Sequence, residues 1–174
     1  MIKKYFTLIV LSVSFAVIYA CSNDNDNDYT PISPVTVDLT LVPYPKLSDY
    51  KFFEGDLKNL NPSLDVIPYE PISSLFTDYA HKKRFVWFPN GTKATYNGDD
   101  QILELPVGAV LIKNFYYDNV QPSNVTKIIE TRLMIRKSDG WIFADYVWND
   151  EQTEANLDLN GSTKTISWKD ENNV

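Results

Sequence analysis

The chain has 174 residues, of which 44% are hydrophobic and 14% aromatic, and its formal net charge is −7. The apolar content is sufficient for a folded core and excludes a wholly disordered chain. The acidic balance argues against nucleic-acid binding, because a negative surface repels phosphate backbones. With one cysteine (Cys21) and one histidine (His81), the sequence supports neither an internal disulfide nor a His-rich metal site.

The first twenty residues have the pattern of a bacterial lipoprotein signal. Two lysines give a positive start, and an uncharged apolar run follows through Val17. The small residue Ala20 directly precedes Cys21, so this segment is similar to a lipobox, in which the cysteine is lipidated after cleavage. The apolar run is short for a membrane-spanning helix, which needs about 20 residues. We therefore expect residues 1–20 to be removed and Cys21 to carry the lipid anchor.

An acidic polar run follows the cysteine and predicts a flexible tether over residues 21–34. Once the signal is removed, the chain has 14 basic and 23 acidic residues and a net charge of −9. One interpretation of residues 22–28 is a plain spacer. The other is a sorting signal, because acidic residues directly after a lipidated cysteine resemble a surface-export signal of some Gram-negative bacteria. We favour the second and expect an outer-membrane lipoprotein that faces outward.

The remaining residues, 35–174, have the pattern of a β-rich domain. Residues 35–42 alternate well enough for a strand or an extended arm, and residues 47–53 can form a short helix capped by Ser48. Residues 149–160 are polar and predict a loop. We expect strands at 66–69 (an edge piece), 84–88, 93–96, 102–105, 107–117, 126–136, 141–148 and 163–168. Short strands separated by Gly, Asn and Asp turns predict an all-β fold, an antiparallel β-sandwich or open barrel of about seven to nine strands.

Residues 126–136 show the clearest period of two along the chain. One face consists of Ile129, Thr131, Leu133 and Ile135, and we expect it to meet the core. The other face consists of Ile128, Glu130, Arg132, Met134 and Arg136.

No group of residues forms a recognisable catalytic pattern. The carboxylates that could act as a general acid or base are Glu54, Asp56, Asp78, Glu130 and Asp145. Nothing in the sequence places two of them together, and an ion pair such as Glu130 with Arg132 is the favoured interpretation. His81 stands beside three basic residues and is expected to be exposed. We predict no catalytic residue and no metal ligand.

Aromatic residues provide the best candidate for a binding site. Tyr117, Trp141 and Trp148 lie in predicted strands and could form a stacking platform for a glycan or another ligand with an apolar face. The same side chains could instead fill the core of a small domain, and this alternative is favoured.

Several sequence phrases run in order through residues 46–168. They are KLSDY (46–50), FFEGDL (52–57), IPY (67–69), LFTDYA (75–80), KKRFVW (82–87), LIKNFYY (111–117), IETRL (129–133) and YVWN (146–149). Together they resemble the N-terminal domain of a family of exported bacterial proteins described as dihaem c-type cytochromes. The resemblance implies a β-rich fold and an envelope setting.

In that family, Cys-x-x-Cys-His motifs that attach haem follow the β-rich region. This chain contains no such motif, so the resemblance implies no haem ligand here, and we expect no cofactor. Two interpretations stay open, a natural haem-less relative or a chain that ends early. The end at residues 169–174, just past a predicted strand, favours truncation and predicts an open sheet edge or apolar face.

The sequence therefore leaves two functions in view, and neither is catalytic. The resemblance implies the non-haem front part of a cytochrome-like lipoprotein, with an electron-transfer or envelope protein as its partner. The alternative is a surface lipoprotein module that binds a carbohydrate or another ligand. A hydrolase has no support beyond the presence of carboxylates.

Overall fold

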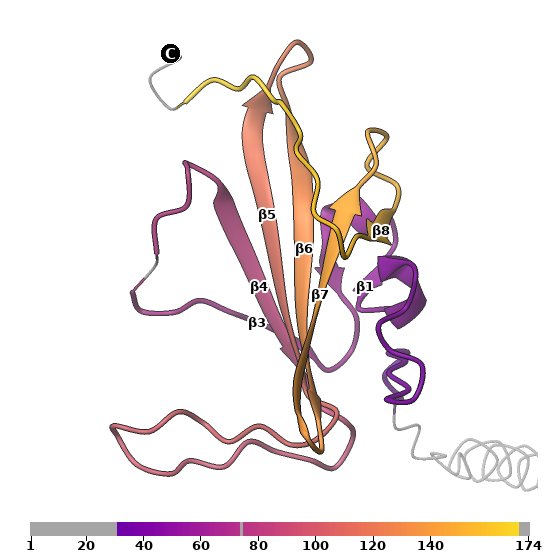
Figure 1. Cartoon of the computed structure of the whole chain (residues 1–174), viewed down its shortest axis with the longest axis vertical. Coiled ribbons are helices and arrows are strands. Elements are labelled where there is room, and N and C mark those ends of the chain that lie inside the picture. Colours follow the sequence, from indigo (N-terminus) through magenta and orange to yellow (C-terminus); the bar gives the residue numbers. More distant parts are fainter. Residues whose placement is uncertain (1–30, 74, 171–174) are drawn as a thin grey trace, which may run out of the picture. The chain divides into compact units, whose positions relative to one another are not determined.

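Most of the fold is one antiparallel sheet whose six strands follow one another in sequence order (Figure 1). The computed structural model describes residues 31–73 and 75–170, so the predicted signal, Cys21 and most of the tether lie outside the described residues. The six strands are β3 (Val66–Tyr69), β4 (His81–Trp87), β5 (Val110–Val120), β6 (Val125–Lys137), β7 (Gly140–Trp148) and β8 (Ala155–Leu157). β-Branched and aromatic residues are frequent in β4 to β7, as a pleated and half-buried surface favours.

A second, small sheet precedes the large one. It pairs β1 (Phe53–Glu54) with β2 (Asn61–Pro62), and two 3₁₀ helices accompany it, η1 (Leu47–Tyr50) and η2 (Leu57–Asn59). The described residues thus contain eight strands, and the predicted all-β class is confirmed. Within the same ranges, no helix has the length and apolar character that crossing a bilayer requires.

The core lies on one face of the large sheet, and the preceding segment covers that face. Ile112, Leu133 and Tyr146 of the sheet form one buried cluster with Leu47 and Phe52. Burial of each such side chain contributes about 1.5–3 kcal/mol. A hydrogen bond from Leu157 N to Pro45 O (2.9 Å) ties the covering segment to the β8 edge.

Two buried tyrosines in this core, Tyr50 and Tyr146, form a hydrogen bond with each other. The hydroxyls of Tyr50 and Tyr146 lie 2.9 Å apart, and the Tyr146 hydroxyl donates to Tyr44 O at 2.8 Å. Tyr50 also accepts a hydrogen bond from Tyr44 N at 3.0 Å. The polar ends of both rings are therefore paired, which offsets the cost of burying them.

The structure decides between the two N-terminal alternatives and corrects a helix. Residues 35–42 join neither sheet and form the predicted arm instead of a strand, with Val35 and Val37 packed against the core. The predicted helix at 47–53 is only η1, and Ser48 lies inside it instead of capping it. The Ser48 hydroxyl donates to the Glu154 carboxylate at 2.6 Å, and Lys51 ends the helix in a left-handed conformation (φ 57°). The tertiary contact with Glu154 outweighs the local capping preference.

The predicted core face of β6 is wrong at one position, because the strand contains a β-bulge. Phe115 pairs with Glu130 while Tyr116 pairs with Ile128, so Ile129 is an extra residue without a partner. Ile128 consequently turns inward and is buried, whereas Ile129 is half-exposed. The predicted inward positions of Thr131, Leu133 and Ile135 are confirmed.

Three further strand predictions are wrong in part. The ranges 93–96 and 102–105 form a single bridge, Thr95 with Glu104, in the long loop that projects from the sheet between β4 and β5 (Figure 1). The range 163–168 forms only the bridge of Trp168 with Val120. In contrast, β8 lies inside the predicted loop at 149–160. These segments are short, so their pairing depends on the neighbour that the fold provides.

Candidate functional site

The three aromatic residues predicted as a platform lie in different places. Trp148 is in the core, with 1% of its surface exposed. Trp141 lies seven positions earlier in β7, so its side chain is on the opposite face of the sheet, where the Arg136 guanidinium lies 5.7 Å from its ring centre. Tyr117 is near the other end of the sheet, in β5. The three do not form one surface.

Trp148 has a structural role in a buried polar chain. Its Nε1 donates to Thr131 Oγ1 at 2.9 Å, and this hydroxyl donates to Asn114 Oδ1 at 2.6 Å. Asn114 Nδ2 in turn donates to Lys83 O at 3.2 Å. A buried polar chain in which each member has a partner rigidifies a core and fixes how its strands pack.

Tyr117 belongs to an aromatic cluster, which we define as Phe76, Tyr79, Tyr117 and Trp168. The ring centres of Tyr117 and Trp168 lie 4.8 Å apart, Trp168 and Tyr79 lie 6.4 Å apart, and Tyr79 and Phe76 lie 5.2 Å apart. These separations are typical of interacting aromatic rings. Tyr79 is 69% exposed and Phe76 is 73% exposed, so the cluster presents apolar ring surface to solvent.

The aromatic cluster is held in place by three segments that lie far apart in the sequence. Residues 158–170 run from β8 back to the end of β5 (Figure 1), where Gln121 N donates to Ser167 O at 2.8 Å. The Tyr117 hydroxyl donates to Asp78 O at 2.8 Å and so fixes the loop before β4. Burial raises the pKa of Tyr117, and the Asp78 carboxylate adds to the effect, so the hydroxyl stays protonated and remains a donor.

A hollow of about 330 Å³ lies beside the aromatic cluster. Its lining residues are Tyr79, His81, Asp118, Asn119, Trp168, Lys169 and Asp170. His81 Nε2 lies 3.8 Å from Asp118 Oδ2, and both side chains are about half-exposed. The His81 ring also stacks on Tyr116 with a centre-to-centre distance of 5.3 Å. The hollow therefore combines an aromatic wall with charged and amide groups that can form hydrogen bonds.

No family model, no curated protein and no solved structure matches this chain.

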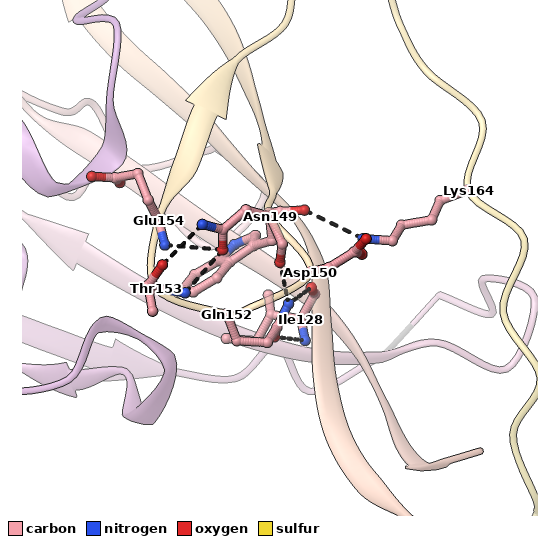
Figure 2. A network of polar contacts seen from close by, with 8 residues as sticks. Ile128, Asn149, Asp150, Gln152, Thr153, Glu154 and Lys164 are labelled. Carbon is pink, nitrogen blue, oxygen red and sulfur yellow. Dashed lines mark hydrogen bonds and ion pairs between the residues drawn. The ribbon is translucent and has the colours of Figure 1, made fainter. Parts of the chain in front are cut away.

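A second hollow, of about 370 Å³, lies between the η1–η2 region and the loop after β7. Figure 2 shows how that loop is held: Gln152 Oε1 accepts from Ile128 N at 2.7 Å, and Gln152 Nε2 donates to Ile128 O at 3.0 Å. Asn149 Oδ1 accepts from Thr153 N at 2.9 Å in the same network. Gln152 thus pairs with the strand at the β6 bulge, and we interpret the surroundings of this hollow as structural.

Of the predicted carboxylates, the structure brings Glu130 and Asp145 together, both beside Arg132. Glu130 bonds to the Arg132 guanidinium, and Asp145 Oδ1 lies 3.9 Å from Arg132 Nε, which confirms the predicted ion pair. Burial raises the pKa of Asp145, and the nearby Glu130 adds to the effect. Glu54 and Asp56 are exposed near the small sheet, far along the chain from this pair. Among the described residues, no three His, Cys, Asp or Glu side chains come together as a metal site.

Of the four cluster residues, the sequence indicated only Tyr117 as a candidate ligand residue, whereas Phe76, Tyr79 and Trp168 were not singled out. Asp78 and Tyr79 both have positive φ angles (37° and 64°), an uncommon turn that no local sequence signal indicated. Trp168 reaches Tyr117 through a single bridge at Val120, across a large separation in sequence. Contacts of this kind have no periodic pattern from which they could be predicted.

Proposed function

We propose that this chain is a membrane-anchored lipoprotein of the cell envelope whose β-domain binds a carbohydrate without catalysis. The observation that carries the binding proposal is the aromatic cluster of Phe76, Tyr79, Tyr117 and Trp168 beside a polar hollow, with Phe76 and Tyr79 exposed and the other two rings partly exposed. Large exposed apolar surfaces next to polar groups mark binding sites in soluble domains.

A sugar ring suits this arrangement because it has an apolar C–H face and a polar edge. The Trp168 and Tyr79 rings offer flat surfaces against which such a face can pack. Asp118 and His81, at the side of the hollow, offer an acceptor and a donor for ring hydroxyls. Backbone bonds from Gln121 N to Ser167 O and from Lys169 N to Asn119 O hold the chain on both sides of Trp168. The Trp168 ring is therefore in place before a ligand arrives, and this reduces the entropy cost of binding.

The anchoring part of the proposal rests on the sequence around Cys21. The short apolar run, Ala20 before the cysteine and the acidic run after it support an outer-membrane lipoprotein that faces outward. We expect cells fed an alkyne-bearing palmitate to label the protein and to retain it in the membrane fraction. Cys21→Ser should lose the label and leave that fraction. Equal labelling of both forms would contradict lipidation at Cys21.

A second candidate function rests on the resemblance to the N-terminal domain of the dihaem cytochrome-like family. In that case the β-domain would support an envelope partner that carries the haem. The phrases behind the resemblance contribute much of the core, including Leu47, Tyr50, Phe52, Phe85 and Tyr146. Core residues bear on the fold more directly than on the activity, so we place this function second.

Carbohydrate binding can be tested with two matched tryptophan variants. On a glycan array, followed by calorimetry with the best ligand, we expect Trp168→Ala to weaken binding at least tenfold, because it removes a stacking surface worth about 1.4 kcal/mol or more. Trp141→Ala removes the same type of side chain from β7, outside the aromatic cluster, and should leave the affinity unchanged. Equal affinities for wild type and Trp168→Ala, or no glycan ligand at all, would count against the proposal.

A further inference from the structure

A row of three cations crosses the face of the large sheet opposite the core. Arg84 of β4 pairs in register with Lys113 of β5, and Lys113 pairs with Arg132 of β6. Residues directly opposite each other in neighbouring strands point to the same face. Tyr69 and Asp145 occupy the two ends of the same row. We call Arg84, Lys113 and Arg132 the cationic row.

An apolar row lies beside the cationic row on the same face. Its members, in register across five strands, are Ile67, Val86, Leu111, Met134 and Phe143. Ile67 is 52% exposed and Phe143 is 65% exposed, and the three residues between them are half-exposed. The apolar row is therefore a hydrophobic stripe that the described part of the chain leaves accessible to solvent.

The cationic row works against the stability of the isolated domain. Like charges directly opposite each other on neighbouring strands are destabilising. Burial lowers the pKa of Lys113, and the positive charges of Arg84, Lys82 and Arg132 lower it further. Glu130 and Asp145 compensate Arg132, but within the described residues no carboxylate forms an ion pair with Arg84 or Lys113.

The aromatic ring of Phe115, next to the cationic row, contacts two of its three cations. Lys113 Nζ lies 4.6 Å from the ring centre of Phe115, and the Arg132 guanidinium lies 5.0 Å from it. Cation–π contacts at partly exposed sites contribute about 0.5–1 kcal/mol. Phe115 itself is only 7% exposed, although it points away from the core. In a chain with net charge −7, this local concentration of positive charge is consistent with an acidic ligand.

We infer that the cationic and apolar rows dock an acidic amphipathic helix of a protein partner, lying across the strands. Neighbouring strands are about 4.7–4.9 Å apart, close to the 5.4 Å between carboxylates one helical turn apart, whereas alternate residues of an extended chain are separated by about 6.8 Å. Five strands span about 19 Å, which matches roughly 13 helical residues. The apolar stripe of such a helix would cover the neighbouring apolar row.

The composition of the apolar row favours a protein over a polysaccharide. Its central members, Val86, Leu111 and Met134, are aliphatic or flexible and offer no flat ring for a sugar. Methionine and arginine are enriched at protein interfaces, and methionine adapts its shape to a partner. The two rows share no residue with the aromatic cluster, so the inference does not depend on the proposed carbohydrate site.

A stapled 14-residue helical peptide tests the inference. It carries glutamates one turn apart and leucines on the adjacent stripe, and its binding is measured by fluorescence anisotropy against the full mature chain. We expect Arg84→Gln with Lys113→Gln to weaken binding at least tenfold, and Met134→Ser to weaken it several-fold. Lys93→Gln, which removes an exposed charge from the loop after β4, is the matched control and should bind as wild type does.

A stability measurement separates lost docking from lost folding. The double variant removes like-charge repulsion but also loses the contact of Lys113 with Phe115, and these opposite effects should leave its thermal unfolding temperature close to that of the wild type. The inference is overturned if the double variant binds the peptide as tightly as the wild type does. It is also overturned if only polygalacturonate or anionic lipid vesicles bind this face. Neither result would affect glycan binding at Trp168.

Discussion

Replacing Trp148 with alanine is expected to lower the free energy of unfolding by about 3–5 kcal/mol. The side chain is 1% exposed, so its removal leaves a large cavity in the core. The change also removes the donor to Thr131 Oγ1 and interrupts the buried chain that continues to Asn114. A buried polar group that loses a partner adds to the cost of the cavity. Urea denaturation followed by circular dichroism measures the effect.

Trp141→Ala is the matched control in the same strand. Trp141 lies on the opposite face, partly exposed and in contact with Arg136, so its loss should cost less than about 1 kcal/mol. The two Trp→Ala substitutions should therefore differ strongly in their loss of unfolding free energy, because the two rings lie on opposite faces of the sheet. Similar losses for both variants would contradict the placement of Trp148 in the core.

Replacing Gln152 with alanine is expected to cost about 2–4 kcal/mol, because it leaves two buried backbone groups without partners. The Gln152 amide satisfies both the N–H and the C=O of Ile128, at 2.7 and 3.0 Å, where the bulge interrupts normal strand pairing (Figure 2). The loop that carries Gln152 also closes the connection from β7 to β8. Chemical denaturation gives the loss directly.

Gln121→Ala is the control for this prediction. Gln121 also uses its amide for local contacts, with Asn119 O and Asn124 Oδ1, but these lie in an exposed turn where water can replace them. Its replacement should change stability by less than about 0.5 kcal/mol. A Gln152→Ala protein as stable as Gln121→Ala would show that Gln152 does not hold the bulge.

The central strands could be predicted from sequence because they carry strong local patterns. Period two in β6 and the turn residues on either side located the strand and most of its inward residues. The bulge at Ile129 could not be predicted, because it depends on how β5 and β6 align. The role of Ser48 likewise depends on Glu154, a partner far away in the chain that only the fold brings near.

The residues of the candidate sites could also be predicted only in part, because their neighbours come from distant segments of the chain. Tyr117 was one of two open interpretations, a ligand platform or a core residue, but its neighbours Tyr79 and Trp168 come from a tight turn and a single-bridge segment. The cationic row was visible only in part: Arg132 was placed on the outward face, whereas its alignment with Lys113 and Arg84 is set by strand register. Cross-strand neighbours are a tertiary property that a single sequence does not encode locally.

The indole N–H signals of the four tryptophans test the carbohydrate site most directly. Trp87 and Trp148 are buried, Trp141 lies at the start of β7, and Trp168 lies in the aromatic cluster, so each reports on a different region. When the best ligand from the array is titrated into ¹⁵N-labelled protein, we expect the Trp168 signal to shift while the other three stay in place. A shift of Trp141 with Trp168 unmoved, or no shift of any indole, would contradict binding at this site.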